Sequence, residues 1–350
     1  MLRVPNMVPL HRAGPKPATL KPRVLDSYDI RDLRLHPGRD LRPLLAEESA
    51  VWRRELLWDY SHSIELLIGY LDQRILPGFV AVERRTGQVH GYAFAVYETQ
   101  KAVVGDLFAS GSRRIELQQL LLRHLLPMLQ HTPGVERVES QLLLTPPELQ
   151  PVFAEAAFRS FPRLFMQTEL PDLRELIPAG SLVRREDEPA PDLGSLRLRR
   201  WTAPMYQPAA DLIHRAYVGH GDTEINDQYR SVQGCLRFLH NIVRFPGCGT
   251  FTPEHSWVLV EERTGEVDGL LLTTRVEPQT THIPQLCLAP RRRGRGLGRT
   301  MLRHAATELA RAGQRTVTLT VTEANAGALQ LYRQLGFTPR HRFHADVWWR

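Results

Sequence analysis

QLCLAPRRRGRGLGRTMLRHAATEL, residues 285–309, passes from a short apolar strand through an arginine- and glycine-rich loop directly into a helix. The three alternating glycines of the loop are Gly294, Gly296 and Gly298. Glycines allow backbone N–H groups to crowd together at a helix N-terminus, where the helix dipole favours an anion. The neighbouring arginines add attraction and bidentate contacts to phosphate. The stretch therefore predicts a cradle for a phosphate or pyrophosphate group.

Two common phosphate-binding motifs do not fit this loop. A P-loop requires GxxxxGK followed by Ser or Thr, and the sequence has no Gly-Lys pair. A dinucleotide-binding fingerprint requires GxGxxG, whereas Gly294, Gly296 and Gly298 give the wrong last spacing. A purely structural glycine turn with incidental arginines stays open as an alternative at this point.

Composition indicates a globular protein of ordinary character. The chain has 350 residues, enough for two domains, with 42% hydrophobic and 8% aromatic residues. The net charge of +7 comes mostly from arginines spread along the chain. No basic helix face with interleaved aromatics accompanies it, so we expect no nucleic-acid partner. An arginine-rich surface and an anionic small ligand explain the charge equally well.

The cysteines and the N-terminal residues bear on the cellular setting. Cys235, Cys248 and Cys287 have neither paired nor metal-ligand spacing, so we expect a reduced, cytoplasmic protein without a metal. No apolar run approaches the roughly 18 residues of a membrane span. Residues 1–26 lack a continuous apolar segment and predict a disordered tail rather than a secretory signal.

A hairpin sequence occurs twice in the chain. Residues 79–91 read FVAVERRTGQVHG and residues 257–269 read WVLVEERTGEVDG. Convergence on favoured turn chemistry is the simpler explanation, but the flanking segments repeat at nearly the same offset. We therefore predict a tandem duplication of one α/β domain, each copy a central mixed sheet flanked by helices. The predicted copies are residues 27–176 and 196–350, joined by a Pro- and Gly-rich linker at 177–195.

The two copies differ at the loop. Where the second copy has RRRGRGLGRT, the first has GSRRIELQQL, without alternating glycines and with Glu116 facing any anion. Where the second copy has Tyr332, the first has Phe153, which carries no exchangeable proton. We predict that the N-terminal copy is degenerate and serves to pack, to shape a cleft, or to bind an unrelated ligand.

A second motif follows the loop and one intervening strand. Residues 325–337 read NAGALQLYRQLGF, in which Asn325 can cap a helix and Gly336 can end it. The pattern N-x-x-A-x-x-L-Y-x-x-x-G-F, together with the loop R-x-x-G-x-G at residues 293–298, resembles the two motifs of the GNAT N-acetyltransferase superfamily. The resemblance covers about residues 196–343 directly, and the first copy through the repeat.

The resemblance implies an acyl-CoA site and a set of residues that form it. In this family the strand before the loop carries a bulge and splays from its neighbour, and a tyrosine protonates the leaving thiolate. The residues implied to bind acetyl-CoA are Leu286, Cys287, Leu288, Arg293, Gly294, Arg295, Gly296, Leu297, Gly298, Arg299, Thr300, Asn325 and Ala328. Tyr332 is implied as the general acid, with a buried core tyrosine as the simpler alternative.

The general base is not fixed by the sequence, although an attacking ammonium must first lose a proton. The candidates are His220, Asp222, Glu224, Asp227, Glu261 and His282. Glu224 is the tentative choice, because the polar stretch HGDTEINDQYRS is long for a simple loop and is predicted to line the acceptor site. His220, Asp222 and Glu224 alternate but lack a second cluster, so no metal is expected.

The sequence thus predicts acetyl transfer from acetyl-CoA to a primary amine of a small molecule, by direct attack in a ternary complex. Tandem mycothiol synthases, which this layout resembles, act on amino-sugar metabolites. A protein or peptide amine is the rival acceptor, and a non-catalytic acyl-CoA sensor or scaffold is the rival class. The acceptor itself and the oligomeric state are not predicted.

Overall fold

The computed structural model describes residues 26–171, 181–185, 188, 191–244 and 247–350. The predicted disordered tail lies outside the described residues except for Asp26. The predicted linker at 177–195 is described only in part, so the predicted domain boundaries remain a prediction. None of the helices within the described ranges is long and apolar enough to cross a membrane.

The N-terminal half contains six strands, four longer or medium helices and two single 3-10 turns among its described residues. In chain order these are β1 (Tyr28–Asp32), η1 (Leu33–Leu35), α2 (Gly38–Leu56), α3 (Ser61–Asp72), β2 (Gly78–Glu83), β3 (Val89–Glu98), β4 (Lys101–Ala109), α4 (Arg114–His131), β5 (Arg137–Ser140), η2 (Pro147–Leu149), α5 (Gln150–Glu155) and β6 (Arg159–Glu169).

The C-terminal half repeats this order with additions around its second helix. Its elements are β7 (Leu196–Arg200), η3 (Ala203–Met205), α6 (Tyr206–Tyr217), α7 (Asp222–Ile225), η4 (Asp227–Arg230), α8 (Val232–Arg244), β8 (Thr250–Phe251), η5 (Pro253–His255), β9 (Trp257–Glu261), β10 (Val267–Glu277), β11 (Thr280–Leu288), η6 (Pro290–Arg292), α9 (Leu297–Arg311), β12 (Thr316–Thr322), α10 (Ala326–Gln334) and β13 (Thr338–Trp349).

Local chemistry explains the repeated hairpins. Gly87 and Gly265 occupy the two turns with φ of 73° and 71°, a left-handed conformation that other residues adopt only with strain. In each turn the threonine directly before the glycine supports the backbone. The hydroxyl of Thr86 accepts from the Gln88 N–H and that of Thr264 from the Glu266 N–H, both at 3.2 Å. The predicted hairpins and the predicted mixed α/β fold are both confirmed.

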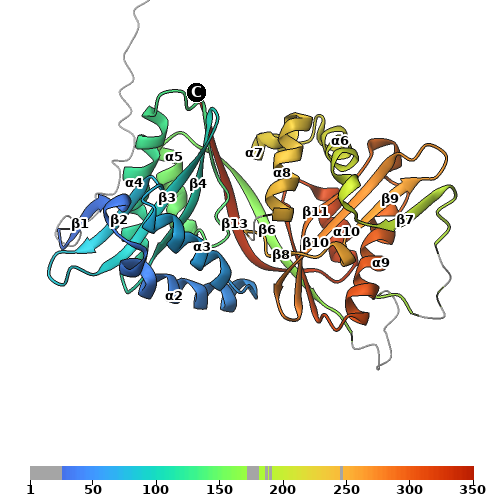
Figure 1. The fold of residues 1–350 in the computed structure, drawn as a ribbon, viewed down its shortest axis with the longest axis horizontal. Helices are drawn as coiled ribbons and strands as arrows, with labels where there is room; N and C mark the ends of the chain where they lie inside the picture. Colours follow the sequence, from blue (N-terminus) through green and yellow to red (C-terminus); the bar gives the residue numbers. More distant parts are fainter. Residues whose placement is uncertain (1–25, 172–180, 186–187, 189–190, 245–246) are drawn as a thin grey trace, which may run out of the picture.

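The strands form one continuous sheet in which the last strands of the two halves are exchanged. The order is β1-β2-β3-β4-β5-β13-β6-β12-β11-β10-β9-β7. β13, from the C-terminal half, pairs with β5 of the N-terminal half, and β6 pairs with β12. β6 and β13 also pair with each other in antiparallel orientation between the two halves (Figure 1). The sequence did not predict this exchange.

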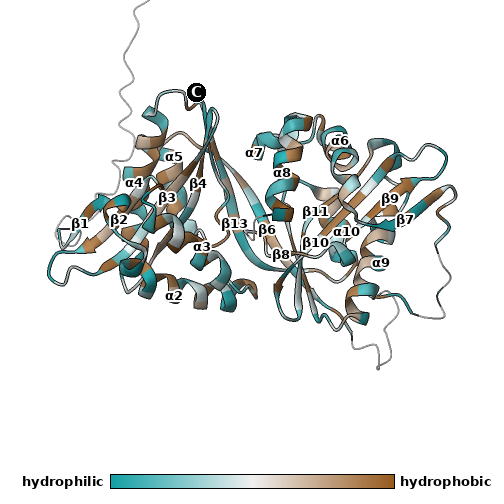
Figure 2. Ribbon diagram, in the orientation of Figure 1, coloured by the Kyte–Doolittle hydropathy of each residue, from teal (hydrophilic) through white to brown (hydrophobic). Residues whose placement is uncertain are grey.

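The sheet is covered on both faces in the C-terminal half. One apolar cluster joins α9 and α10 to alternate residues of β11 and β12, and another joins α6 and α8 to β9 and β10 (Figure 1). Figure 2 shows the hydrophobic residues concentrated on the strands and on the helix faces turned toward them. Because these two clusters pack closely on both faces, the side chains on β10, β11 and β12 are held in fixed positions.

Candidate functional site

The pairing between β11 and β12 ends partway along both strands, and the place where the two strands part is called the slot. The two strands pair in parallel only from Thr280 with Thr316 to Ile283 with Leu319. Beyond that point β11 pairs with β10 alone, and it carries one extra residue, because Leu272 faces Gln285 whereas Thr274 faces His282. Pro284 sits in this bulge, where its missing N–H costs no ladder hydrogen bond. The splayed, bulged strand expected from the resemblance is therefore present.

The glycine loop lies between the end of β11 and the start of α9. Gly294 and Gly296 have φ of 73° and 74°, and a Cβ atom at either position would point into open space. The left-handed backbone, rather than crowding, is thus what requires glycine at both positions. Gly296 is the N-cap of α9, and the loop is exposed. Exposed backbone N–H groups at this helix N-terminus fit an anion such as pyrophosphate.

The arginines around the loop have two different roles. Arg291 and Arg292 both bind Asp268, a fully buried carboxylate, at 2.6 and 2.7 Å. Arg293 donates to the Ala216 carbonyl at the end of α6. Arg295 is exposed, and no contact ties it down among the residues that the structure describes. Arg291 and Arg292 therefore anchor the loop, and Arg295 is left to meet a ligand.

The other predicted acyl-CoA residues lie around the slot and the loop. Leu286 and Leu288 pack on the α9 side of the sheet and Cys287 on the α6 side. Arg299 donates to the Gln334 side chain on α10, which links the two motif helices. The first residues of α9 include Leu297, Gly298 and Thr300, and Ala328 lies in α10. Their roles as ligands remain predictions.

Asn325 and Tyr332 lie at the two ends of α10. Asn325 caps the helix by accepting from the Ala328 N–H at 3.2 Å, as the sequence predicts. Tyr332 is 8% exposed, and burial and the nearby charge of Asp222 raise its pKa well above the ordinary value for tyrosine. No hydrogen bond from its hydroxyl to another described residue is present. Tyr332 is therefore a protonated phenol at neutral pH.

His220 and Asp222 reach the same end of the slot from the polar stretch. The Asp222 N–H donates to His220 Nδ1 at 3.1 Å, and His220 Nε2 lies 3.4 Å from the side-chain nitrogen of Asn325. Asp222 is also the charge that acts on Tyr332. The structure thus brings His220 and Asp222 of the polar stretch close to Asn325 and Tyr332 of the second motif, beside the slot.

The remaining base candidates are engaged elsewhere. The tentative choice, Glu224, forms an ion pair with Arg159 of β6. Glu261 binds Ser195 and Arg292, and the Ser195 hydrogen bond and the Arg292 charge lower its pKa. These contacts hold the carboxylates of Glu224 and Glu261 to neighbouring elements of the fold. The assignment of Glu224 as base stays a prediction, although its contacts do not favour it.

His282 faces the other half of the molecule. It stacks on Phe165 at 5.8 Å and contacts Trp58 of the N-terminal half at 5.1 Å. Burial and the charge of Arg163 lower its pKa to about 3. A base that weak takes a proton poorly from an ammonium group, so His282 is a poor candidate for that role.

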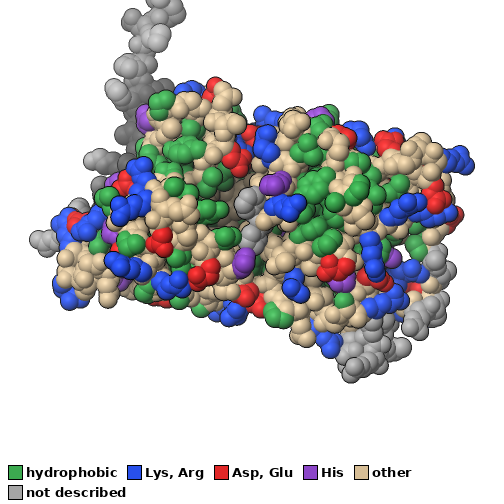
Figure 3. Space-filling view, in the orientation of Figure 1, with side chains coloured by type: hydrophobic (Ala, Val, Ile, Leu, Met, Phe, Trp, Pro, Cys, Tyr) green, Lys and Arg blue, Asp and Glu red, His purple; other side chains and the backbone are tan. Residues whose placement is uncertain are grey.

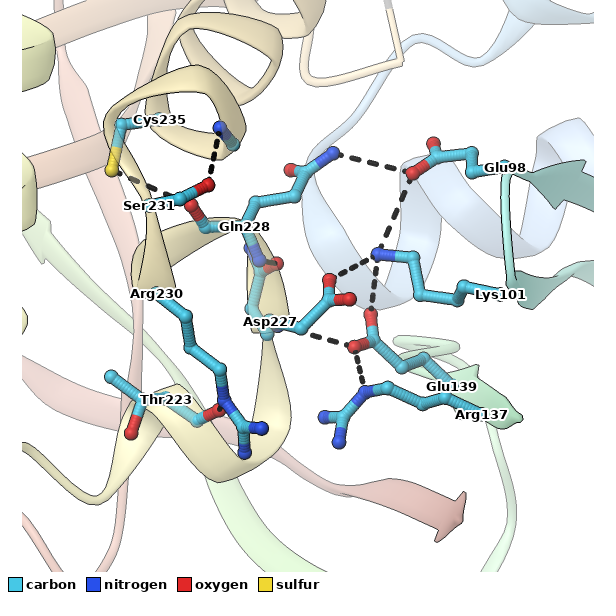
Figure 4. A network of polar contacts seen from close by, with 12 residues as sticks. Glu98, Lys101, Arg137, Glu139, Thr223, Asp227, Gln228, Arg230, Ser231 and Cys235 are labelled. Atoms are coloured by element: carbon cyan, nitrogen blue, oxygen red, sulfur yellow. Dashed lines mark hydrogen bonds and ion pairs between the residues drawn. The ribbon is translucent and has the colours of Figure 1, made fainter. Parts of the chain in front are cut away.

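The polar stretch is fastened to the N-terminal half by a buried ion network (Figure 4). Lys101 Nζ lies 2.6 Å from Asp227 and 3.3 Å from Glu139, and the Asp227 N–H donates to Glu139 at 3.2 Å. Arg137 binds Glu139 at 2.5 Å and donates to the Glu224 carbonyl. Burial alone would lower the pKa of Lys101, but the surrounding carboxylates raise it. The fourth base candidate, Asp227, thus serves this interface.

Sequence reasoning missed two tyrosines and a glutamine on the α6 side of the slot. Tyr217 and Tyr229 stack at 4.0 Å, and the Gln285 side chain donates to the Tyr217 hydroxyl at 3.3 Å. Burial raises the pKa of both tyrosines well above the usual value. Their spacing of twelve residues across a helix end carries no periodic signal. The one sequence signal was for Gln285, which lies on the strand that the resemblance predicts to be bulged.

The described residues contain no group of three His, Cys, Asp or Glu side chains placed to hold a metal ion. On the face shown in Figure 3, Lys and Arg side chains are interspersed with Asp and Glu and do not form one continuous basic patch.

Comparisons with known proteins agree with this geometry. A model of the acetyltransferase (GNAT) family matches residues 226–337. A streptothricin acetyltransferase from Streptomyces lavendulae is 41% identical over 59 residues, which is 17% of this chain and 31% of that protein. The matched segment therefore spans about a third of that curated relative.

Two solved structures extend the similarity over nearly the whole chain at the level of the fold. A GCN5-related N-acetyltransferase from Sphaerobacter thermophilus has a TM-score of 0.61 and 16% identity, covering 93% of this chain and 96% of that one. A tandem GNAT protein from the clavulanic acid biosynthesis pathway has a TM-score of 0.51 and 15% identity, covering 92% and 98%. The acetyltransferase (GNAT) family model thus matches residues 226–337, which contain the bulged strand and the glycine loop, and the two solved structures show the same fold over nearly the whole chain.

Proposed function

We propose that the chain is an N-acyltransferase that transfers an acetyl group from acetyl-CoA to a primary amine of a small molecule. The observation that carries this proposal is the glycine loop at the end of β11, directly beside the slot where β11 and β12 part. In this proposal the N–H groups of residues 294–298 hold the pyrophosphate, because the Arg293 N–H already donates to the Pro290 carbonyl, and Asn325 contacts the pantetheine arm. The splayed backbone of β11 faces the thioester oxygen as it gains charge.

The proposed reaction needs one acid and one base. The amine nitrogen attacks the thioester carbon, the C–S bond breaks, and the Tyr332 hydroxyl gives its proton to the departing thiolate. His220 accepts the proton that the attacking amine loses, directly or through one water. Its support is its place beside Asn325 and Asp222, on the side of the slot that the polar stretch covers.

The choice of base gives a testable contrast between two residues of the polar stretch. We expect His220→Gln to lower kcat/KM by about a hundredfold, as loss of a general base does. Glu224→Gln removes only a half-exposed ion pair with Arg159, so we expect a change of less than about threefold. Steady-state kinetics on both variants with one amine measures the contrast. The reverse ranking would return the role to Glu224.

A small-molecule acceptor is supported by the contacts that hold the polar stretch against the N-terminal half. The polar stretch is held against the N-terminal half by the Lys101 network, so both halves bound that side of the slot. A site with protein on both sides suits a small molecule better than an extended peptide, which needs an open groove. The streptothricin acetyltransferase is named for a small-molecule substrate, which is in keeping with this choice.

Product formation tests the proposal. The protein is incubated with acetyl-CoA and a panel of small primary amines and, separately, peptides with free N-termini or lysines, and products are identified by mass spectrometry. We expect acetylated small amines from the parent and none from Gly296→Val, because a β-branched residue at a φ of 74° distorts the loop. Gly87→Val, at a φ of 73° in a remote turn, is the matched control and retains activity. Acetyl-CoA binding without any product would instead indicate a sensor.

A further inference from the structure

A large cavity is lined mostly by residues of the N-terminal half, with several from the C-terminal half, and none of its lining residues belongs to the glycine loop. It has a volume of about 1560 Å³ and is lined mainly by α2, α3, β4 and the segment after β5. Figure 3 shows a recess between the two halves on the face drawn there. Its wall includes Trp52, Trp58, Tyr60, Phe94 and Phe108. An aromatic cavity of this size is large enough for a small organic ligand.

Two buried carboxyl groups form part of the cavity wall. Glu48 is 1% exposed and Asp106 is 6% exposed. The Tyr92 hydroxyl lies 2.6 Å from Glu48 and 2.9 Å from Asp106. That hydroxyl has one proton and cannot donate to two carboxylates. One of the two acids must therefore be protonated.

The proton resides on Glu48. Burial, followed by the charge of Asp106, raises the pKa of Glu48 well above its usual range. Burial raises the pKa of Asp106 as well, but three hydrogen bonds act in the opposite direction, from Tyr60 at 2.8 Å, from Tyr92 and from the Leu107 N–H at 2.8 Å. We therefore place the remaining negative charge on Asp106. Neither acid has an ion-pair partner among the residues that the structure describes. A single buried negative charge thus faces the cavity with no described cation within ion-pair distance, an arrangement that is costly unless a ligand supplies the cation.

Gln118 provides an independent sign of a missing ligand. It is 5% exposed and lines the same cavity, yet its side-chain oxygen has no hydrogen-bond partner among the described residues. Buried polar atoms are normally satisfied, so this acceptor is available to an N–H donor. The aromatic rings nearby agree with this: Trp52 and Tyr60 stack at 4.4 Å with an interplanar angle of 3° and present π-faces, which attract cations.

The repeat explains why this is a different site from the slot in the C-terminal half. Asp106 occupies the position on β4 that Gln285 occupies on β11, next to the same kind of bulge. A neutral amide at that position tolerates charge developing on a thioester oxygen, whereas a carboxylate repels it. The place around Asp106 in the N-terminal half is therefore suited to a cation and unsuited to the acyl chemistry.

The arginines of the cavity wall do not alter this conclusion near the carboxyl pair. Arg54 pairs with Glu55 at 2.8 Å, and Arg163 donates to Gln141 at 2.6 Å. Arg114 is exposed at the start of α4. We propose that this cavity binds an organic ammonium ion with an aromatic or apolar body, whose N–H groups bind Asp106 and Gln118 and whose body packs on the Trp52–Tyr60 pair.

The test measures binding of 2-phenylethylamine and its neutral counterpart 2-phenylethanol, without acyl-CoA, by calorimetry and by the fluorescence of the cavity tryptophans. We expect the amine to bind at least about tenfold more tightly than the alcohol to the whole protein. In Asp106→Asn the amine should lose at least about tenfold in affinity, and the alcohol should be unaffected. Glu65→Gln, which removes an exposed carboxylate of α3, should behave like the parent.

A second variant keeps the proposal testable if Asp106→Asn does not fold. Gln118→Leu keeps the side-chain volume and removes the unpaired oxygen, so it should weaken the amine while leaving the melting temperature equal or higher. The same amine binding is expected in Gly296→Val, so failure of the transferase proposal would not affect it. Equal affinity for amine and alcohol, no binding of either, or displacement of the amine by coenzyme A in Gly296→Val would overturn the proposal.

Discussion

Replacing Tyr332 by phenylalanine is expected to lower kcat for acetyl transfer by about 10²–10⁴-fold, the usual contribution of a general acid. The ring stays packed in the cluster beside β12, so the KM for acetyl-CoA should change by less than about threefold. The hydroxyl has no hydrogen bond to another described residue, so folding stability should hardly change. Steady-state kinetics and thermal unfolding measure the two effects.

The N-terminal half offers a matched control for this substitution. Tyr97→Phe also removes one tyrosine hydroxyl, which contacts Thr132 on an exposed face. Its turnover should equal that of the parent. If Tyr332→Phe retained turnover within about threefold, Tyr332 would be a packing residue, and water or another group would protonate the thiolate.

Replacing Lys101 by methionine is expected to lower the free energy of unfolding by about 3–5 kcal/mol, the usual cost of breaking a buried ion pair from one side. Lys101 is 6% exposed and serves Glu98, Glu139 and Asp227 together. Without it, Arg137 is the one cation left in the network for these acids (Figure 4). The polar stretch should then part from the N-terminal half.

Two measurements separate this effect from general destabilisation. Urea unfolding gives the free-energy change, and hydrogen exchange should show residues 222–231 losing protection before the rest of the C-terminal half. Arg342→Met is the control, because it removes an exposed pair with Glu323 and should cost under about 1 kcal/mol. A cost for Lys101→Met as small as that of the control would show that the network does not hold the halves together.

Features that depend on neighbouring residues could be predicted from the sequence. The hairpin turns follow from Gly87 and Gly265, the start of α10 follows from Asn325, and α9 starts directly after Gly296. Each depends on backbone chemistry within a few residues. For the same reason the family resemblance was readable from two short motifs.

Features that depend on distant partners could not be predicted. The polar stretch contains no signal that Asp227 would meet Lys101, 126 residues away, so its carboxylates looked equivalent. Likewise, Glu48 and Asp106 belong to a helix and a strand that the repeat alone does not bring together. The cavity they line becomes apparent only when α2 and α3 are folded onto β4.

The exchange of β6 and β13 suggests how this chain arose and how it should respond to cutting. Counted from either end of the sheet, equivalent strands of the two halves follow one another in the same order. The central pair, β6 and β13, is antiparallel, as expected for two subunits related by a twofold axis. A symmetric ancestor in which each subunit lent its last strand to the other would give this sheet after gene fusion. A protease cut between the halves should therefore leave two fragments that remain clasped until a denaturant separates them.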